Sequence, residues 1–538
     1  MLTARERGLY MGLSGHKLLK GTLILSITGF LTKIIGFFYK IYLADLLGAE
    51  MLGIYQLVFP VYGICFTIYG AGIQTAISQV IAAGSSNKGR KTSPGKILAI
   101  GILLGLSLAV TLSFLVYTQA DWIAVHFVME ASLAPYLRIL SFLFPFCCVS
   151  ACINGYYYGI QDAKVPAVTQ MVEQIFRVIF VMLLSFLFSA GASDDLNCSF
   201  AVWGLVAGEV ASNLYNIYQL SHHSSLARRY KKNKMSVQKT GQSEISHLKT
   251  TFSSSHAVRT LLWLSLTLTV TKLLVSFLHS VESVLLPAML RRYGCSPSYA
   301  LSVYGILTGM SLSFIFFPST ITNSFAVMLL PSIADAHARK DIDKIRHSVT
   351  LSIKYCLLIG LLCTCVFLMF GKELGILFFH NEDAGSYLTV LSWLCPFLYL
   401  GTTLTSVING MEKTQVTFFY TILSLGVKIA ILVFAVPIYG IRAYLVGLLI
   451  SQLVMVILEG YYLHPYIRLD ALHWLLIPSL ALVVLGVVAK NSYFRINSCF
   501  HGSYAILTLA VIATLLCIGY CGFLYLMGII SVRDIKQT

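Results

Sequence analysis

Long apolar blocks separated by short polar segments are the dominant pattern along this chain of 538 residues. A helix that spans a bilayer needs about 20 apolar residues, and blocks of that length recur about fourteen times. They cover residues 21–43, 54–83, 97–118, 133–158, 166–190, 200–220, 260–290, 300–330, 348–370, 386–409, 416–437, 440–463, 472–489 and 504–528. The pattern predicts an all-α polytopic membrane protein with about fourteen transmembrane helices.

The composition agrees with this prediction. Hydrophobic residues make up 57% of the chain and charged residues only 11%, whereas soluble globular proteins carry about 25% charged residues. An ordinary cytosolic enzyme and a disordered protein are therefore excluded. The strands of a membrane β-barrel would alternate apolar and polar positions, and the long continuous blocks exclude that class as well.

Basic residues concentrate on one side of the predicted topology. The chain carries 38 Lys and Arg against 22 Asp and Glu, a net charge of +16. With the N-terminus inside, inner segments hold 25 of these basic residues and outer loops hold six, among which the pair Arg291–Arg292 is the one local exception. Cytoplasmic loops carry such an excess, so we expect a multi-pass protein of the cell membrane with both termini cytoplasmic. Because no nucleic-acid motif accompanies the charge, we expect no nucleic-acid partner.

Two halves of the chain resemble each other. YLRILSFLFPF at 136–146 and YLTVLSWLCPF at 387–397 are identical at seven of eleven positions, at an offset of 251. SITGFLTKIIGFF at 26–38 matches SLTLTVTKLLVSF at 265–277, at an offset of 239. We therefore expect two six-helix lobes in a parallel repeat, an architecture that places substrate in a central cavity. The predicted parts are the lobes 1–220 and 260–465, a basic cytoplasmic linker at 221–259, and two extra helices at 466–538.

Seven basic residues lie inside the predicted helices, where a charge costs at least about 2.5–3.5 kcal/mol. Five of them fall into repeat-related pairs of cationic or potentially cationic positions. These pairs are Lys33 with Lys272, Lys40 with His279, and Arg177 with Lys428. We predict that Lys33, Lys40, Arg177, Lys272 and Lys428 face a central cavity and bind an anionic substrate, for which phosphate or diphosphate is the natural candidate.

Acidic residues and one histidine accompany these cations. We expect Glu173, Glu209, His279 and Glu282 to balance the cavity charge or to couple transport to a proton or a sodium ion. The alternative is that buried Lys–Glu pairs only tie helices together. Since the sequence has no metal-binding motif, nucleophile–base set or nucleotide loop, we predict no catalysis, no cofactor and no metal site.

Three longer segments resemble a known family. KIIGFFYKIYLADLLGAEMLGIYQLVFPVYG at 33–63, with GAGIQTAISQVIAAG at 70–84, is similar to the stage V sporulation protein B family, and so is YGILTGMSLSFIFFPSTITNSFAVMLLPSIADA at 304–336. This family belongs to the multidrug/oligosaccharidyl-lipid/polysaccharide (MOP) exporter superfamily. The resemblance implies two six-helix lobes around a central cavity. It also implies that the two extra C-terminal helices form a groove for a polyprenyl tail.

The function that this resemblance implies is a flippase. Its partners would be membrane lipids and an undecaprenyl-diphosphate-linked saccharide, either the peptidoglycan precursor or an oligosaccharide, in cell-wall or spore-cortex synthesis. Three alternatives remain open. A multidrug or cation antiporter would favour an acidic cavity, and a membrane enzyme acting on lipid-linked sugars would need a large outer loop. A non-transporting scaffold of the cell-wall machinery does not need the buried charges.

Overall fold

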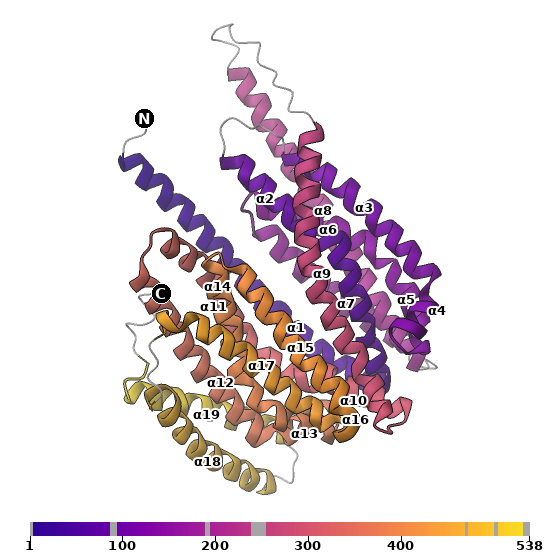
Figure 1. Cartoon of the computed structure of the whole chain (residues 1–538), viewed down its shortest axis with the longest axis vertical. Coiled ribbons are helices and arrows are strands. Elements are labelled where there is room, and N and C mark those ends of the chain that lie inside the picture. Colours follow the sequence, from indigo (N-terminus) through magenta and orange to yellow (C-terminus); the bar gives the residue numbers. More distant parts are fainter. Residues whose placement is uncertain are drawn as a thin grey trace. The chain divides into compact units, whose positions relative to one another are not determined.

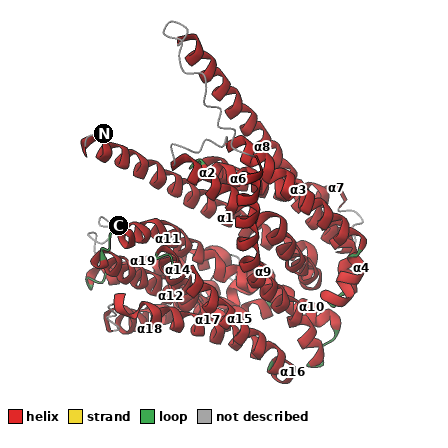
Figure 2. Cartoon of the chain, turned by 45° about the horizontal axis from the view of Figure 1, so that its top comes forward, coloured by secondary structure: helices red, strands yellow, loops and turns green. Residues whose placement is uncertain are grey.

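The computed structural model describes residues 4–86, 94–188, 194–237, 254–467, 472–499 and 504–530, and these ranges are almost entirely helical and contain no strand (Figures 1 and 2). Each of the fourteen apolar blocks is almost entirely helical over its described residues. The prediction of an all-α polytopic membrane protein is confirmed, because the length and hydropathy of a block decide whether it forms a spanning helix.

The chain divides into two compact units. Unit 1 comprises Met1–Ile35 and Leu57–Ser280, and unit 2 comprises Gly36–Gln56 and Val281–Thr538. The second part of the first apolar block therefore belongs with the C-terminal half of the chain. Conversely, the first part of the block at 260–290 belongs with the N-terminal half.

Unit 1 contains the start and the end of the first long helix and most of the helices of the N-terminal half. Its elements are α1 (Ala4–Phe66, without the part in unit 2), the π-helix η1 (Thr67–Ala71), α2 (Gly72–Ser86), α3 (Pro94–Thr118), α4 (Ala120–Trp122), the π-helix η2 (Ile123–Phe127), the 3-10 helix η3 (Ala131–Leu133), α5 (Ala134–Ser141), α6 (Leu143–Gly159), α7 (Lys164–Phe188), α8 (Asp194–Val237) and α9 (Ser254–Arg292, as far as Ser280).

Unit 2 contains the middle of α1, the end of α9 and all later elements. These are α10 (Pro297–Gly305), the π-helix η5 (Ile306–Ser311), α11 (Leu312–Ala338), α12 (Ile342–Phe379), α13 (Glu382–Leu391), the 3-10 helix η6 (Ser392–Leu394), α14 (Cys395–Gly410), α15 (Thr414–Phe434), α16 (Val436–Tyr439), α17 (Ile441–Leu463), the 3-10 helix η7 (His464–Tyr466), the π-helix η8 (Leu472–Leu476), α18 (Ile477–Cys499) and α19 (Ala505–Leu526).

Several helices are long and apolar enough to cross a membrane. Within the described ranges there are 11, or up to 12 if each bent pair is one span, by length and composition. One of them, Ile27–Ala83, has 57 residues, about 85 Å at 1.5 Å per residue and far more than the bilayer core of about 30 Å. The backbone of Gly48 (φ 69°, ψ 176°) breaks it between the first two predicted spans. The total of about fourteen stays a prediction.

The segment expected to be a linker, 221–259, is helical at both of its described ends. Helix α8 continues to Val237 and α9 begins at Ser254, while 238–253 lies outside the described residues. The polar continuation of α8 at 221–237 contains two Arg and three Lys residues. These residues have high helix propensity, so a helix that leaves an apolar block can extend through them.

A hydrogen bond recurs in both units at the repeat offset. Pro145 and Pro396 have no backbone N–H. The carbonyl groups four residues earlier, those of Ser141 and Ser392, therefore lack their usual helical donor. The hydroxyl of Ser113 donates to the Ser141 carbonyl (2.7 Å), and that of Thr364, 251 positions after Ser113, donates to the Ser392 carbonyl (2.9 Å). The two halves therefore share a structural solution as well as a sequence pattern.

Glycine contacts recur in the same way. A Cβ added at Gly159 of α6 would lie 2.7 Å from the Ile81 Cβ, and one at Gly410 of α14 would lie 3.0 Å from the Ile333 Cβ. Gly159 and Gly410 are 251 positions apart. In each unit the absence of a side chain brings a helix close to the second half of another helix, α2 or α11.

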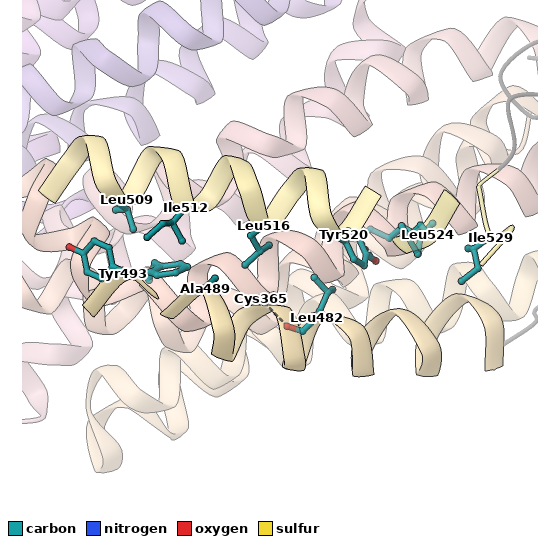
Figure 3. Close-up of a cluster of buried hydrophobic side chains, with 12 residues drawn as sticks. Cys365, Leu482, Ala489, Tyr493, Leu509, Ile512, Leu516, Tyr520, Leu524 and Ile529 are labelled. Atoms are coloured by element: carbon teal, nitrogen blue, oxygen red, sulfur yellow. Dashed lines mark hydrogen bonds between the residues drawn. The ribbon is translucent and has the colours of Figure 1, made fainter. Parts of the chain in front are cut away.

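Helices α18 and α19 pack on α12 in unit 2. Figure 3 shows Leu482, Ala489 and Tyr493 of α18 facing a row of α19 side chains, with Cys365 of α12 between them. The Cys365 thiol donates a hydrogen bond to the Leu482 carbonyl (3.3 Å). The two extra helices at 466–538 are thus anchored to the C-terminal half by a cluster of buried apolar side chains.

Candidate functional site

A π-helix precedes the part of α2 that carries several polar side chains. In a π-helix the backbone hydrogen bonds shift from i→i−4 to i→i−5, and such bulges are frequent at functional sites. η1 ends at Ala71, whose carbonyl accepts a hydrogen bond from the Thr75 hydroxyl (2.9 Å). It also accepts one from the ammonium of Lys272 on α9 (3.1 Å), which donates to Thr75 Oγ1 as well (2.8 Å). Lys272, predicted to face a cavity, is thus held at the end of the π-helix.

Lys272 lines a polar cavity of about 360 Å³. We call this cavity the Lys272 pocket; its lining residues all lie in unit 1 and are Ala71, Gln74, Thr75, Ser78, Tyr158 and Lys272. One ammonium, three hydroxyl groups and one amide meet there. An ammonium has three N–H donors, of which two bind Ala71 and Thr75. The third is available to an anionic group that enters the pocket.

Two glycines bring the neighbouring helices close to the Lys272 pocket. A Cβ added at Gly72 would lie 1.9 Å from Thr269 Oγ1, and one at Gly155 would lie 2.5 Å from the Gln74 carbonyl oxygen. Thr269 is one turn before Lys272 on α9, so the close contact at Gly72 sets where the ammonium lies. Gly155 similarly brings α6 and its Tyr158 against α2. Because any side chain at these two positions would separate the helices, the glycines determine the shape of the pocket.

A second charged group joins α7 and α8 in unit 1. The Arg177 guanidinium forms an ion pair with the Glu173 carboxylate one turn earlier and donates to the Gln174 amide oxygen (3.3 Å). Glu209 on α8 is buried, with 7% of its surface exposed, and its carboxyl lies near Glu173 and Arg177. One predicted cation is therefore grouped with two of the predicted acidic residues.

A third group lies in unit 2 and joins α9, α15 and α17. The Lys428 ammonium lies 2.8 Å from Glu282 Oε2, and the side chains are 13% and 9% exposed. The Tyr444 hydroxyl donates to Glu282 Oε1 (2.6 Å). Both oxygens of the buried carboxylate thus have a donor. The positive charge of Lys428 is balanced within the protein.

The remaining predicted residues lie along α1 and α9. Lys40 in unit 2 donates to the Ser313 hydroxyl (3.1 Å), two residues after the π-helix η5. Lys272 in unit 1 and Lys40 in unit 2 therefore each donate to a residue at, or within four residues after, the end of a π-helix, which is η1 for Lys272 and η5 for Lys40. Lys33 and His279 have exposed side chains in unit 1.

Several residues of these groups were not predicted from the sequence. Gln74, Thr75 and Ser78 form a polar stripe at i, i+1 and i+4 of an apolar block, a signal that was present but not used. Glu459 of α17 is fully buried. Its Oε1 accepts from the Thr405 hydroxyl (2.6 Å), and its Oε2 has no hydrogen-bond partner in the described part of the chain. Glu459 is an intramembrane carboxyl, and such residues are rare and are functional candidates.

Comparison with known proteins places the chain in a family. The sequence profile of the polysaccharide biosynthesis protein family matches residues 18–309, more than half of the chain. The chain belongs to this family. A second family profile, MatE, matches residues 255–434 of the chain. Stage V sporulation protein B of Bacillus subtilis (strain 168) is 26% identical over 385 residues, which cover 71% of this chain and 70% of that protein.

Solved structures share the fold. That of the lipid II flippase MurJ in an inward closed conformation has a TM-score of 0.66 at 15% identity, covering 94% of this chain and all of that one. An inward-facing multidrug resistance MATE family transporter of the MOP superfamily has a TM-score of 0.62 at 15% identity, covering 83% of this chain and 98% of its own. The resemblance predicted from the sequence is confirmed by the two family profiles and by stage V sporulation protein B, and these structures share the fold.

Proposed function

We propose that this protein is a flippase that moves a polyprenyl-diphosphate-linked saccharide across the cell membrane by alternating access, in cell-wall or spore-cortex synthesis. The observation that carries the proposal is the Lys272 pocket. A cation with an unused N–H donor, surrounded by hydroxyl and amide groups, suits a ligand that joins a phosphate to a sugar. Membership in the polysaccharide biosynthesis protein family and the fold shared with a lipid II flippase support it.

The Lys272 pocket supplies two kinds of interaction. The ammonium binds a phosphate oxygen as a compact point charge, and the charge-assisted hydrogen bond is stronger than a neutral one. Gln74, Ser78 and Tyr158 carry neutral groups that both donate and accept, as the hydroxyls of a sugar require. The bonds from Lys272 to Ala71 and Thr75 keep the ammonium oriented before the ligand arrives, which lowers the entropy lost on binding.

The other predicted cations have secondary roles in this proposal. Arg177 and Lys428 are paired with Glu173 and Glu282, so they reach the head group only in a conformation in which those pairs open. Lys33 and Lys40 contribute from α1. Glu173, Glu209, Glu282 and His279 balance these charges or couple the cycle to a proton or a sodium ion, and Glu459 joins them as a further intramembrane carboxyl.

The conformational cycle is a rocking of 1–220 against 260–465, with 466–538 guiding the lipid tail and both termini in the cytoplasm. Alternating access in repeat-built transporters is largely of this kind. The contact of α18 and α19 with α12 lets the two extra helices move with the C-terminal part. The relatives whose names state an activity are transporters and a flippase, which agrees with transport in place of catalysis.

A multidrug or cation antiporter is the second candidate. The MatE match at 255–434 favours it, and so do the buried carboxyls of Glu209 and Glu459, because acidic groups suit cationic cargo. The cation of the Lys272 pocket argues against it.

Reconstitution into liposomes tests the proposal. The purified full chain is offered labelled polyprenyl-diphosphate saccharides and, separately, a cationic dye, and transfer to the opposite leaflet or lumen is scored. We expect transfer of a lipid-linked saccharide, and Lys272→Met should slow it by roughly tenfold, the effect of about 1.4 kcal/mol. Lys490→Met, at a half-buried lysine of α18 that does not line the Lys272 pocket, is the matched control and should transport normally. Dye export without lipid transfer would favour the antiporter, and no transport of either would favour a scaffold.

A further inference from the structure

A second cavity lies at one end of unit 2, and no step of the proposed transport uses it. Its volume is about 820 Å³, and it is lined by the end of α9, by α10, α15 and α16, and by the first turns of α17. Figure 1 shows α10 and α16 close together at that end. We call it the Arg442 cavity. The lining residues used below are Tyr293, Tyr299, Tyr439, Arg442, Val446 and Ile450.

Arg442, Val446 and Ile450 follow one face of α17. They are spaced at i, i+4 and i+8, which places them above one another. At 1.5 Å per residue, Ile450 lies about 12 Å from Arg442 along the helix. The side chains of Val446 and Ile450 are 50% and 39% exposed. In a membrane protein, exposed apolar side chains of this kind are covered by hydrocarbon chains, so the cavity offers an apolar track that starts at a cation.

Tyrosines mark the polar end of this track. Tyr293, Tyr299 and Tyr439 line the same cavity, and their exposed fractions are 49%, 52% and 67%. Tyrosine is enriched where a membrane protein meets the lipid head groups, because its ring is apolar and its hydroxyl is polar. This end of the cavity is therefore suited to the head-group region, with Val446 and Ile450 pointing toward hydrocarbon.

The turn before α17 is tightly fitted. Gly440 has a positive φ of 65°, a conformation that glycine adopts without strain. A Cβ at Gly440 would lie 3.0 Å from the Tyr293 ring. The ring thus lies against the turn and holds the α16–α17 connection to the end of α9. The cavity is a built feature of the unit with a fixed wall.

The cation at the start of the track lies at the surface of unit 2. Arg442 is exposed, and in the described ranges no acidic or other polar group pairs with its guanidinium. A positive charge in the first turn of a helix is disfavoured by the helix dipole, so this arginine is placed against the local electrostatic preference. A ligand with a negative charge would remove that cost.

Further positive charge lies beside the cavity. Arg291 and Arg292 directly precede Tyr293 in the chain, and with Arg442 they are half of the six basic residues expected in outer loops. Two acidic groups are close: the Ser298 hydroxyl donates to Glu50, and Asp383 lies near Tyr299. The described residues next to the cavity thus include three arginines and these two carboxyls.

We propose that the Arg442 cavity binds one anionic phospholipid of the bilayer. The planar guanidinium of Arg442 pairs with the phosphate, a geometry in which arginine donates two parallel hydrogen bonds. One acyl chain lies along Val446 and Ile450. The charge of the site and the apolar track that starts there select a lipid with a negatively charged head group over a zwitterionic one. The site is separate from the Lys272 pocket in unit 1.

Spin-labelled lipids test this site. The full chain is reconstituted into phosphatidylcholine vesicles that contain a trace of either spin-labelled phosphatidylglycerol or spin-labelled phosphatidylcholine, and the motionally restricted fraction is measured. We expect a preference of roughly tenfold for phosphatidylglycerol, which corresponds to about 1.4 kcal/mol. Arg442→Gln should abolish the preference. Arg495→Gln, an exposed arginine of α18, is the matched control and should keep it.

A second pair of variants tests the apolar track. Val446→Trp fills the cavity and should reduce the restricted fraction for phosphatidylglycerol. Ile457→Trp on the same helix, where the native side chain is 64% exposed and does not line the cavity, should leave it unchanged. Equal restriction of both lipids in the wild type, or wild-type behaviour of both Arg442→Gln and Val446→Trp, would overturn the proposal. So would displacement of the lipid by millimolar inorganic phosphate, which would indicate a site for the anion alone.

This assay is independent of transport. Lipid restriction is measured at equilibrium and does not require flipping of any substrate. A wild-type protein that moves no lipid-linked saccharide but restricts phosphatidylglycerol would refute the proposed function and retain the site. A wild-type protein that moves the lipid-linked saccharide but does not restrict phosphatidylglycerol preferentially would refute the lipid site and retain the proposed function.

Discussion

Lys272 in unit 1 and Lys428 in unit 2 are both lysines inside predicted spanning helices, but their surroundings differ. The ammonium of Lys272 binds neutral acceptors, Ala71 and Thr75, at the edge of an open polar pocket. The ammonium of Lys428 is buried against the carboxylate of Glu282. The sequence predicted the same role for both. The comparison teaches that two properties of a membrane-embedded cation, its bonding partner and its exposure, decide its role. An exposed cation bound to neutral groups can bind a ligand, whereas a buried cation paired with a carboxylate joins helices.

The largest expected effect comes from removing the carboxylate of the unit 2 pair. Glu282→Leu leaves Lys428 buried without its counter-ion, and breaking a buried pair in this way costs about 3–5 kcal/mol. We expect a large drop in the denaturation midpoint of the purified protein in detergent. By contrast, Lys272→Met should change stability by less than about 1 kcal/mol, because hydrogen bonds to neutral groups in membrane proteins contribute about 0.6 kcal/mol on average.

The double variant Glu282→Leu with Lys428→Leu is the control for this comparison. Replacing both members of a buried ion pair by apolar residues is often neutral or stabilising, so most of the lost stability should return. If Glu282→Leu alone is as stable as the wild type, the pair is not a structural link, and the contrast with Lys272 disappears.

A smaller effect is expected where the two units use equivalent glycines. Gly159→Ala and Gly410→Ala each insert a Cβ within 3.0 Å of a backbone carbonyl oxygen, that of Ser78 or Leu330. Overpacking of this kind costs about 1–3 kcal/mol, and we expect both variants to unfold earlier by similar amounts. Gly426→Ala on α15 is the matched control, since nothing lies within 4 Å of its added Cβ. A loss confined to one of the two glycines would show that the halves do not share this packing.

A further reduction, in the transport rate, is expected from a change inside the Lys272 pocket. Thr75→Val keeps the shape of the side chain but removes the hydroxyl that accepts from Lys272. We expect transport of the lipid-linked saccharide to slow by about threefold to tenfold, less than for Lys272→Met, because the ammonium remains but is less well oriented. Thr111→Val is the control, as its hydroxyl bonds only within α3. Unchanged transport by Thr75→Val would mean that the ammonium needs no such support.

Much of the fold could be predicted from the sequence. All fourteen apolar blocks are almost entirely helical where the structure describes them, because blocks of that length can satisfy their backbone only as helices within a bilayer. The partition of the chain could not be predicted. Residues 36–56 group with the C-terminal half and the start of α9 with the N-terminal half. Side chains that face lipid and those that face another helix are equally apolar, so composition does not tell which neighbour a helix has.

The candidate site was predictable only in part. Glu173 and Arg177 are spaced at i, i+4, and residues so placed share a helix face; the structure contains their ion pair. The link from Glu282 to Lys428 joins helices far apart in the chain, and no spacing rule predicts such a contact. Likewise Tyr158 reaches the Lys272 pocket through the close approach at Gly155, a packing detail that depends on three-dimensional fit.

The smallest expected effect compares the two units at their repeat-related prolines. Ser113→Ala and Thr364→Val each remove the hydroxyl that donates to the carbonyl facing Pro145 or Pro396. Such a side-chain hydrogen bond in a membrane protein contributes about 0.6 kcal/mol on average and at most about 1.7. We therefore expect small and similar decreases in the denaturation midpoint. Ser107→Ala, whose hydroxyl bonds within the exposed face of α3, should have no effect. Because each hydroxyl compensates a carbonyl deprived of its usual N–H partner in a medium without water, a zero effect at both positions would mean that other groups already satisfy these carbonyls and that the shared hydrogen bond does not stabilise either half.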